Sequence, residues 1–178
     1  AALSPGSDVL VHLPYFQGER TPNLPDASGV FLGLTEDNFT QGHMARSVME
    51  GVAFGLNYGL DRMKDLGIRP KQIRVTGGGS NSAEWGQILA NAFESEVVGL
   101  STSEGAAFGA ALQALWCYRL GRGERVRIAH ITDELVKTDS KTSAKPDKKT
   151  IKKYRQLQDL HNQLSQACRP IFAAHKGL

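Results

Sequence analysis

The stretch Ile73-Arg-Val-Thr-Gly-Gly-Gly-Ser-Asn-Ser-Ala-Glu-Trp85 carries more information about the fold than any other part of the chain. An alternating strand leads into three glycines, and polar capping residues then begin a helix with an apolar stripe. A backbone without Cβ atoms lets a flat or anionic ligand approach closely, and the helix directs free N–H groups toward it. This pattern suits a nucleotide site or a tight turn without a ligand, and the three glycines by themselves do not decide between the two.

The other elements alternate between strands and helices along the chain. The predicted strands are 8–14, 29–34, 73–76 and 96–100. The predicted helices are 40–66, 82–95, 104–120 and 148–174. Pro170 should kink or end the last helix, the apolar run 29–34 is typical of a strand covered on both faces, and residues 121–147 should be irregular. The order predicts an α/β domain with parallel strands joined by crossover helices.

The helix predicted at 40–66 has a distinctive pattern, with Thr40 as its cap and Gly67 after its last turn. Apolar residues recur at spacings of four and three and form one stripe of the kind that packs against a core. They are Met44, Val48, Val52, Leu56, Leu60 and Met63. Small residues such as Gly51, Gly55 and Gly59 favour close packing against a neighbour, and Arg46 with Glu50 predicts an ion pair along the helix.

The composition is that of a globular protein, with 40% hydrophobic and 22% charged residues. No run of about 18 uncharged apolar residues could span a membrane. The start, Ala1-Ala-Leu-Ser-Pro5, resembles neither a natural N-terminus nor a signal peptide, so we expect a fragment. The two cysteines, Cys117 and Cys168, and the five histidines follow no metal-ligand spacing. We therefore assign no metal, and we expect free thiols in the cytoplasm.

The net charge of +3 is concentrated in one segment. Between Lys137 and Arg155 the chain has eight basic and two acidic residues. The segment lacks interleaved aromatic residues and any groove-reading motif, which argues against nucleic acid or a membrane surface as its partner. We interpret it as a solvated linker.

Four motifs follow one another in order between about residues 8 and 120. They are Leu13-Pro-Tyr-Phe-Gln-Gly-Glu-Arg-Thr-Pro22, the signature from Gly29 to Glu50, Val75-Thr-Gly-Gly-Gly-Ser80 and Glu104-Gly-Ala-Ala-Phe-Gly-Ala-Ala111. Together they resemble the second lobe of the FGGY family of carbohydrate kinases. The first of these motifs is most similar to the xylulose kinases of that family.

The resemblance implies a ribonuclease-H-like lobe of the actin-like ATPase fold, with a mixed sheet flanked by helices and a C-terminal helical tail. Residues 1–136 would form the second, nucleotide-side lobe, and 137–178 a basic linker and the C-terminal helix. The N-terminal lobe would be absent from this chain. One early strand of that fold is not located, and we expect it in 14–28 or before Ala1.

The resemblance also implies ATP-dependent phosphorylation of a sugar hydroxyl by the intact protein, with Mg²⁺ screening the phosphates and D-xylulose as the favoured substrate. Gluconate, ribulose and glycerol are the alternative substrates. A non-catalytic actin-like module that binds nucleotide is the rival from another class, and the sugar-side loop 18–22 argues against it. The partners would be ATP, a ketopentose and the N-terminal lobe, and a homodimer stays open.

The family pattern assigns site residues on the nucleotide side. Gly78 and Gly79 would face the adenine and ribose, Gly77 would shape the turn, and Asn81 or Ser82 would either contact the nucleotide or cap the helix. On the substrate side the loop residues Glu19 and Arg20 would border the cleft, Arg20 facing phosphate or pairing in a structural salt bridge. We expect Trp85 in the core. No catalytic residue is assigned, since the catalytic Asp of the family belongs to the absent lobe.

Overall fold

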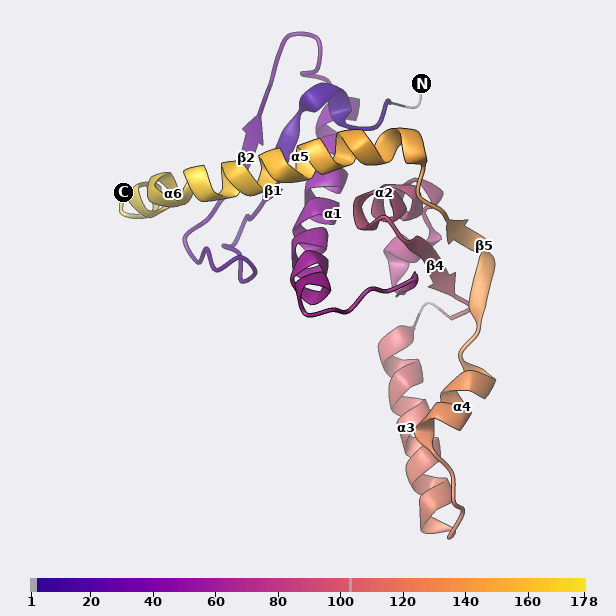
Figure 1. Ribbon diagram of the computed structural model, residues 1–178. Helices are drawn as coiled ribbons and strands as arrows, with labels where there is room; N and C mark the ends of the chain where they lie inside the picture. The colour runs from indigo at the N-terminus through magenta and orange to yellow at the C-terminus, as the bar shows by residue number, and fades with distance from the viewer. Residues whose placement is uncertain (1–2, 103) are drawn as a thin grey trace. The chain divides into compact units, whose positions relative to one another are not determined.

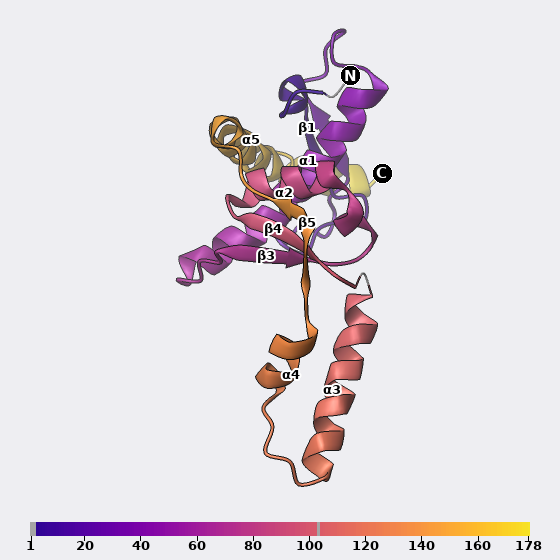
Figure 2. The same cartoon turned by 90° about the vertical axis from the view of Figure 1, so that its right-hand side faces the viewer.

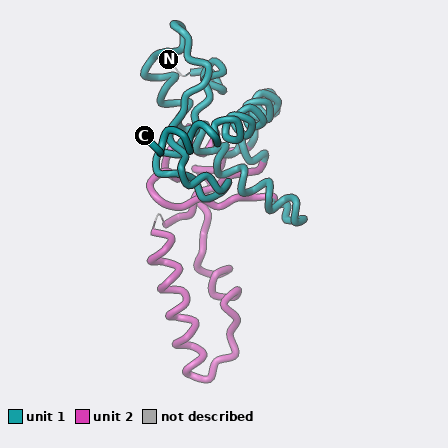
Figure 3. Tube along the Cα trace, turned by 90° about the vertical axis from the view of Figure 1, so that its left-hand side faces the viewer, with its two compact units in different colours: residues 1–70, 88–94, 146–178 teal, residues 71–87, 95–145 magenta. Residues whose placement is uncertain are grey.

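The computed structural model describes residues 3–102 and 104–178, and the expectation that rests on Ala1 and Ala2 lies outside them. The chain folds into two compact units (Figure 3). The first contains the described residues up to Pro70, together with 88–94 and 146–178, and the second contains 71–87 and 95–145. Helix α2 (Ala83–Phe93) therefore contributes its first turn to the second unit and the rest to the first.

The first unit is built on a two-stranded antiparallel sheet, β1 (Val11–Pro14) and β2 (Gly29–Leu32), with Val11 opposite Leu32. A 3₁₀ turn, Ser7–Val9, takes the place of the first part of the predicted strand 8–14. Strand β2 is half-exposed, so the prediction that it is covered on both faces is wrong. Between the two strands the described chain contains isolated bridges and no strand, so 14–28 does not hold the missing early strand.

Helix α1 (Gln41–Asp65) begins after Thr40, whose hydroxyl accepts the N–H of His43 as the sequence predicts. The helix lies against β1, and a Cβ at Gly51 would overlap the carbonyl oxygen of His12. Close packing is thus confirmed at this glycine. Burial differs from the prediction, because Val52, Leu56 and Met63 of the apolar stripe are exposed. The residues that the helix buries are Ser47, Glu50, Gly51, Ala53, Phe54 and Asn57.

The C-terminal helices α5 (Lys148–Ala167) and α6 (Arg169–Lys176) complete the first unit (Figure 1). Helix α5 contacts β1 and α1. It ends at Ala167, and α6 begins after Cys168, close to the kink or end that Pro170 predicts. One apolar cluster joins these elements to the loop between β1 and β2. Its buried members are Leu13, Tyr15, Leu24, Ala27 and Phe172.

The second unit contains a mixed three-stranded sheet (Figure 2). Strands β3 (Gln72–Val75) and β4 (Glu96–Leu100) are parallel, and β5 (Thr138–Ala144) is antiparallel to β4. Helix α3 (Gly105–Gly121) contacts the shorter α4 (Ile128–Leu135). The indole N–H of Trp116 donates to the carbonyl of Val126 at 2.9 Å and ties α3 to the segment before α4.

Two predictions for the C-terminal third are wrong. Residues 121–147 are not irregular, because they include α4 and β5. The basic segment is not a linker, since it forms β5 and the start of α5. Strand β5 forms because the edge of β4 offers it backbone hydrogen-bond partners. The polar sequence of β5 alone does not predict a strand. None of the helices in the described part of the chain has the length and apolar character needed to cross a bilayer.

Candidate functional site: the glycine turn after β3

The glycine turn follows strand β3 directly. Gly77 has φ +90° and ψ 177°, a conformation that L side chains rarely adopt, so this position requires glycine. Gly78–Asn81 then forms a 3₁₀ turn. The turn is held from within, because the amide and the hydroxyl of Ser80 both donate to the carbonyl of Gly77, at 3.0 and 2.7 Å.

The outer side of the turn is open. A Cβ built on Gly77 or Gly78 would meet no atom within 4 Å, and Gly78 and Gly79 are exposed. At Gly79 a Cβ would lie 3.2 Å from Cδ1 of the Trp85 indole, which packs against the turn from the helix side. A planar or anionic ligand could therefore reach the backbone of Gly77 and Gly78 without displacing a side chain.

Two helices begin close to the ends of the parallel strands. Helix α2 starts one residue after Ser82, and α3 starts at Gly105. A Cβ on Gly105 would stand 2.6 Å from the hydroxyl of Thr76, so glycine allows α3 to begin against the end of β3. In open α/β sheets ligands bind outside the carboxyl ends of parallel strands, and helix N-termini there attract anions. The structure thus brings together the motifs 75–80 and 104–111 within one unit.

Ser82 and Asn81 have different roles in this turn. The hydroxyl of Ser82 accepts the N–H of Trp85 at 3.2 Å, and its carbonyl accepts the N–H of Gly86 at 3.0 Å. Ser82 is therefore the cap of α2, one residue later than a capping pair of Asn81 and Glu84 would place it. Asn81 is exposed beside the open glycines, where its side chain could contact a ligand.

The loop 18–22 belongs to the first unit. The carboxylate of Glu19 accepts the backbone N–H groups of Arg20 and Thr21, at 2.7 and 2.9 Å, and the Glu19 backbone pairs with Leu24. Glu19 thus braces its own loop. Arg20 is exposed and, within residues 3–102 and 104–178, it forms no ion pair, so the expected structural salt bridge is not present.

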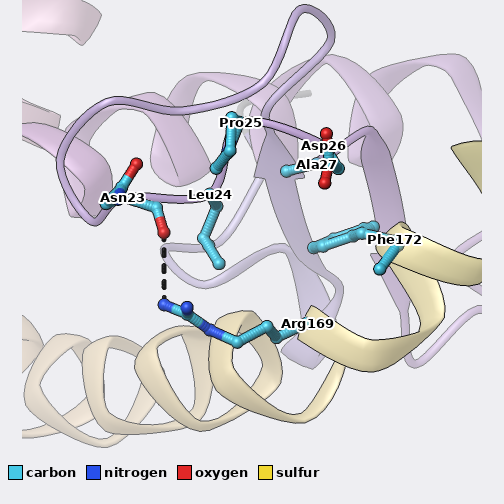
Figure 4. A pocket seen from close by; sticks show the side chains of 8 residues that line it. Asn23, Leu24, Pro25, Asp26, Ala27, Arg169 and Phe172 are labelled. Carbon is cyan, nitrogen blue, oxygen red and sulfur yellow. Dashed lines mark hydrogen bonds between the residues drawn. The ribbon is translucent and has the colours of Figure 1, made fainter.

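The C-terminal helix α6 contacts residues 23–27, which directly follow this loop (Figure 4). The guanidinium of Arg169 donates to the carbonyl of Asn23 at 3.2 Å, and Phe172 is buried in the cluster that includes Leu24. A cavity of about 270 Å³ remains between residues 23–27 and α6. Its lining consists of Asn23, Leu24, Pro25, Asp26, Ala27, Arg169, Phe172 and Ala173. These contacts fix the base of the loop that carries Arg20.

Sequence reasoning missed the buried carboxylate of Glu50. The predicted ion pair with Arg46 is confirmed at 2.9 Å, but Glu50 is only 2% exposed and also accepts the amide of Gly6 at 2.8 Å and the hydroxyl of Ser7 at 3.0 Å. Three of its partners lie before or within α1, and a fourth, Tyr154, lies far along the chain. We interpret Glu50 as a structural residue, because removing one of these partners would leave a buried charge uncompensated.

Comparisons with known proteins agree with the fold. Residues 1–118 match the C-terminal domain of the FGGY family of carbohydrate kinases. The chain is 38% identical to a xylulose kinase of Haemophilus influenzae over 149 residues, 84% of this chain and 29% of that protein. It is 34% identical to a gluconokinase of Bacillus licheniformis over 165 residues, 92% of this chain and 31% of that protein. The structure of a ligand-bound xylulose kinase from Lactobacillus acidophilus matches it with a TM-score of 0.85 at 26% identity, over 97% of this chain and 34% of that chain.

The fold is therefore the actin-like C-terminal lobe of a carbohydrate kinase. The chain belongs to the FGGY family, as its four sequence motifs indicate. It spans about a third of the length of the relatives that it matches. Whatever the remaining two thirds of such a protein contribute to a reaction lies outside this chain.

Proposed function

We propose that the intact protein is an ATP-dependent sugar kinase, and that this chain supplies the nucleotide-binding lobe. The observation that carries the proposal is the open turn at residues 77–79, which lies between two helix N-termini at the carboxyl ends of parallel strands. The residues fit a nucleotide, since an adenine or ribose could lie on the backbone of Gly78 with Asn81 beside it.

ATP, when bound, would supply the γ-phosphoryl group, and Mg²⁺ would screen its charge. Among residues 3–102 and 104–178, no three acidic, histidine or cysteine side chains converge as a metal site would need. The metal would then be held by the phosphates and by residues outside this chain. Arg20 is an exposed guanidinium that could pair with a phosphate, and the Glu19 carboxylate holds the conformation of its loop.

D-Xylulose is the favoured substrate, with D-xylulose 5-phosphate as the product. The support is the motif at 13–22 and the recurrence of xylulose kinases among the relatives. Gluconate is the strongest alternative, because a gluconokinase aligns with 92% of the chain. The sugar contacts would lie mainly on the other lobe. A direct activity measurement must therefore distinguish D-xylulose from gluconate as the substrate.

The full-length protein should be tested for ADP release with D-xylulose, gluconate, ribulose and glycerol. Sugar-dependent ADP release with D-xylulose as the best substrate would support the proposal, and gluconate as the best substrate would correct it. ATP-induced thermal stabilisation without any sugar-dependent turnover would favour the rival, a non-catalytic nucleotide-binding module.

The 178 residues alone should show no sugar-dependent turnover. The catalytic carboxylate that the family resemblance implies would lie outside them, and losing a general base typically costs a factor of about 10² to 10⁴. The unpaired thiols of Cys117 and Cys168 fit a reducing cytoplasmic compartment for this reaction.

A further inference from the structure

A polar hollow of about 190 Å³ lies among α1, the end of α2 and α5, within the first unit. Every residue that lines it except Ala92 has a polar or charged side chain. Asn57 and Asp61 come from α1, Glu94 from the residue after α2, and Asp159 from α5. The described lining includes no residue of the glycine turn or of the loop 18–22, so the proposed function does not account for this hollow.

The amide oxygen of Asn57 has no hydrogen-bond partner among the described residues, although only 5% of Asn57 is exposed. Its neighbour Gln158 fixes the orientation of this amide. Nε2 of Gln158 donates to the carbonyl of Phe54 and to Oδ1 of Asn162, at 3.1 and 3.0 Å, so Oε1 of Gln158 must accept. Nδ2 of Asn57 donates to that oxygen at 3.1 Å and to Asp61 at 3.3 Å. The oxygen of Asn57 is therefore a buried acceptor that still needs a donor.

The charges around the polar hollow leave one carboxylate without a counter-ion. Lys64 pairs with Asp61 at 2.8 Å, and the guanidinium of Arg155 donates two hydrogen bonds to Glu94. Asp159 forms no ion pair within residues 3–102 and 104–178. Two cations thus offset two of the three carboxylates, and a ligand with a single positive charge would offset the third.

We propose that the polar hollow binds a small primary ammonium compound, such as an aminoalcohol, through the amide oxygen of Asn57 and the carboxylate of Asp159. An ammonium group carries one positive charge and three N–H donors, so it can satisfy both groups. A water molecule would satisfy the oxygen but leave the charge of Asp159 without a counter-ion. A metal ion fits less well, because no three acidic, histidine or cysteine side chains converge in the part of the chain that the structure describes.

The test is thermal melting of the full-length protein at neutral pH, without ATP or sugar, as ethanolamine hydrochloride is added. Sodium, potassium and tetramethylammonium chloride at the same ionic strength are the comparisons, because none of their cations has an N–H donor. We expect the melting temperature to rise to saturation with ethanolamine alone, as it does for a ligand that binds only the native state.

Two variants locate the site. Asp159→Asn should raise the apparent Kd for ethanolamine at least about tenfold, because it removes the unpaired charge and keeps the size of the side chain. The matched control is Asp133→Asn, an exposed aspartate of α4 that does not line the hollow, and it should leave the Kd unchanged. Asn57→Leu removes the acceptor and should abolish the response. If Asn57→Leu does not fold, Asp159→Asn and its control decide the outcome.

A saturable response to ethanolamine that only the variants within the hollow weaken would support the proposal. The absence of a response, or an equal response to potassium or tetramethylammonium, would overturn it. Equal weakening by Asp159→Asn and Asp133→Asn would also overturn it, since the effect would then come from the overall charge. The measurement needs neither ATP nor sugar, so its outcome is independent of whether the protein phosphorylates a sugar.

Discussion

The hydroxyl of Tyr154 donates a 2.7 Å hydrogen bond to Oε1 of Glu50, across 104 residues of sequence. The same oxygen accepts the amide of Gly6 at 2.8 Å and Nε of Arg46 at 2.9 Å. The pair therefore joins the N-terminal segment, α1 and α5 around one buried carboxylate. Burial and the negative charge of Glu50 raise the pKa of Tyr154, so the phenol stays protonated and keeps donating across the range of pH in which the protein would work.

The first prediction concerns this pair. Tyr154→Phe should lower the free energy of unfolding by about 1–3 kcal/mol, because it removes one donor from a buried carboxylate that keeps its other partners. Glu50→Ala should lower the free energy of unfolding by about 3–5 kcal/mol, because it leaves the guanidinium of Arg46 without its counter-ion. The Arg46 side chain is only 19% exposed. Urea unfolding gives both values. The control is Tyr118→Phe, whose ring is 61% exposed and which should change stability by less than about 0.5 kcal/mol. Equal effects at the two tyrosines would contradict a structural role for Glu50.

The second prediction concerns acid stability. Burial lowers the pKa of His161 from 6.5 to about 4 and also lowers that of His12. Between pH 6.5 and 4 the ring of His161 binds a proton in the unfolded chain but not in the folded chain. Its contribution to the free energy of unfolding is therefore fully present above pH 6.5 and is lost as the pH falls toward 4. His161 alone should account for a loss of about 3 kcal/mol over that window.

His161→Leu tests this dependence by removing the titrating ring from the core. Its stability should decline less than that of the parent protein between pH 6.5 and 4, as urea midpoints at several pH values would show. The exposed His175 on α6 provides the control, and His175→Leu should leave the slope unchanged. An identical slope in His161→Leu and the parent protein would mean that His161 is not the acid-sensitive group.

The third prediction separates charge from strand pairing in the basic segment. Replacing Lys141, Lys145, Lys148 and Lys152 with glutamine should change the melting temperature little, because all four are exposed. Thr142→Val should cost about 1–3 kcal/mol, since the Thr142 hydroxyl accepts the amide of Gly99 and donates to the carbonyl of Asp139, both at 2.8 Å. If the lysine variant lowered the melting temperature strongly and Thr142→Val lowered it little, then charge rather than strand pairing would hold this segment in place.

The fourth prediction concerns the glycine turn in the full-length protein. Gly78→Val should leave stability almost unchanged, because open space surrounds the position, yet it should raise KM for ATP far more than KM for the sugar. Gly77→Ala should instead lower stability by about 1–2 kcal/mol, because its φ of +90° strains any L residue. Saturation curves and a melting curve measure both. Unchanged ATP saturation in a well-folded Gly78→Val protein would remove the nucleotide role of Gly78.

Local pattern was sufficient to locate most elements of this chain. Thr40 before a periodic stretch and Gly67 after it bounded α1 to within two residues, and the strand–glycine–helix sequence at 73–85 placed β3, the turn and α2. These features depend on capping and backbone conformation, which are determined by residues close together in the sequence. The order of the motifs also identified the family, which the match over residues 1–118 confirms.

Strand β5 and the burial of α1 were decided by tertiary structure. The sequence Thr138–Ala144 is polar and shows no strand period, and it becomes a strand because β4 has an unpaired edge beside it. Helical periodicity located an apolar stripe on α1 but could not say which face would meet β1. Close approach at Gly51 and the partners of Glu50 settled that choice, and the most distant of those partners stands 104 residues away. Contacts between residues so far apart depend on the chain's path in space, and no pattern within one segment records that path.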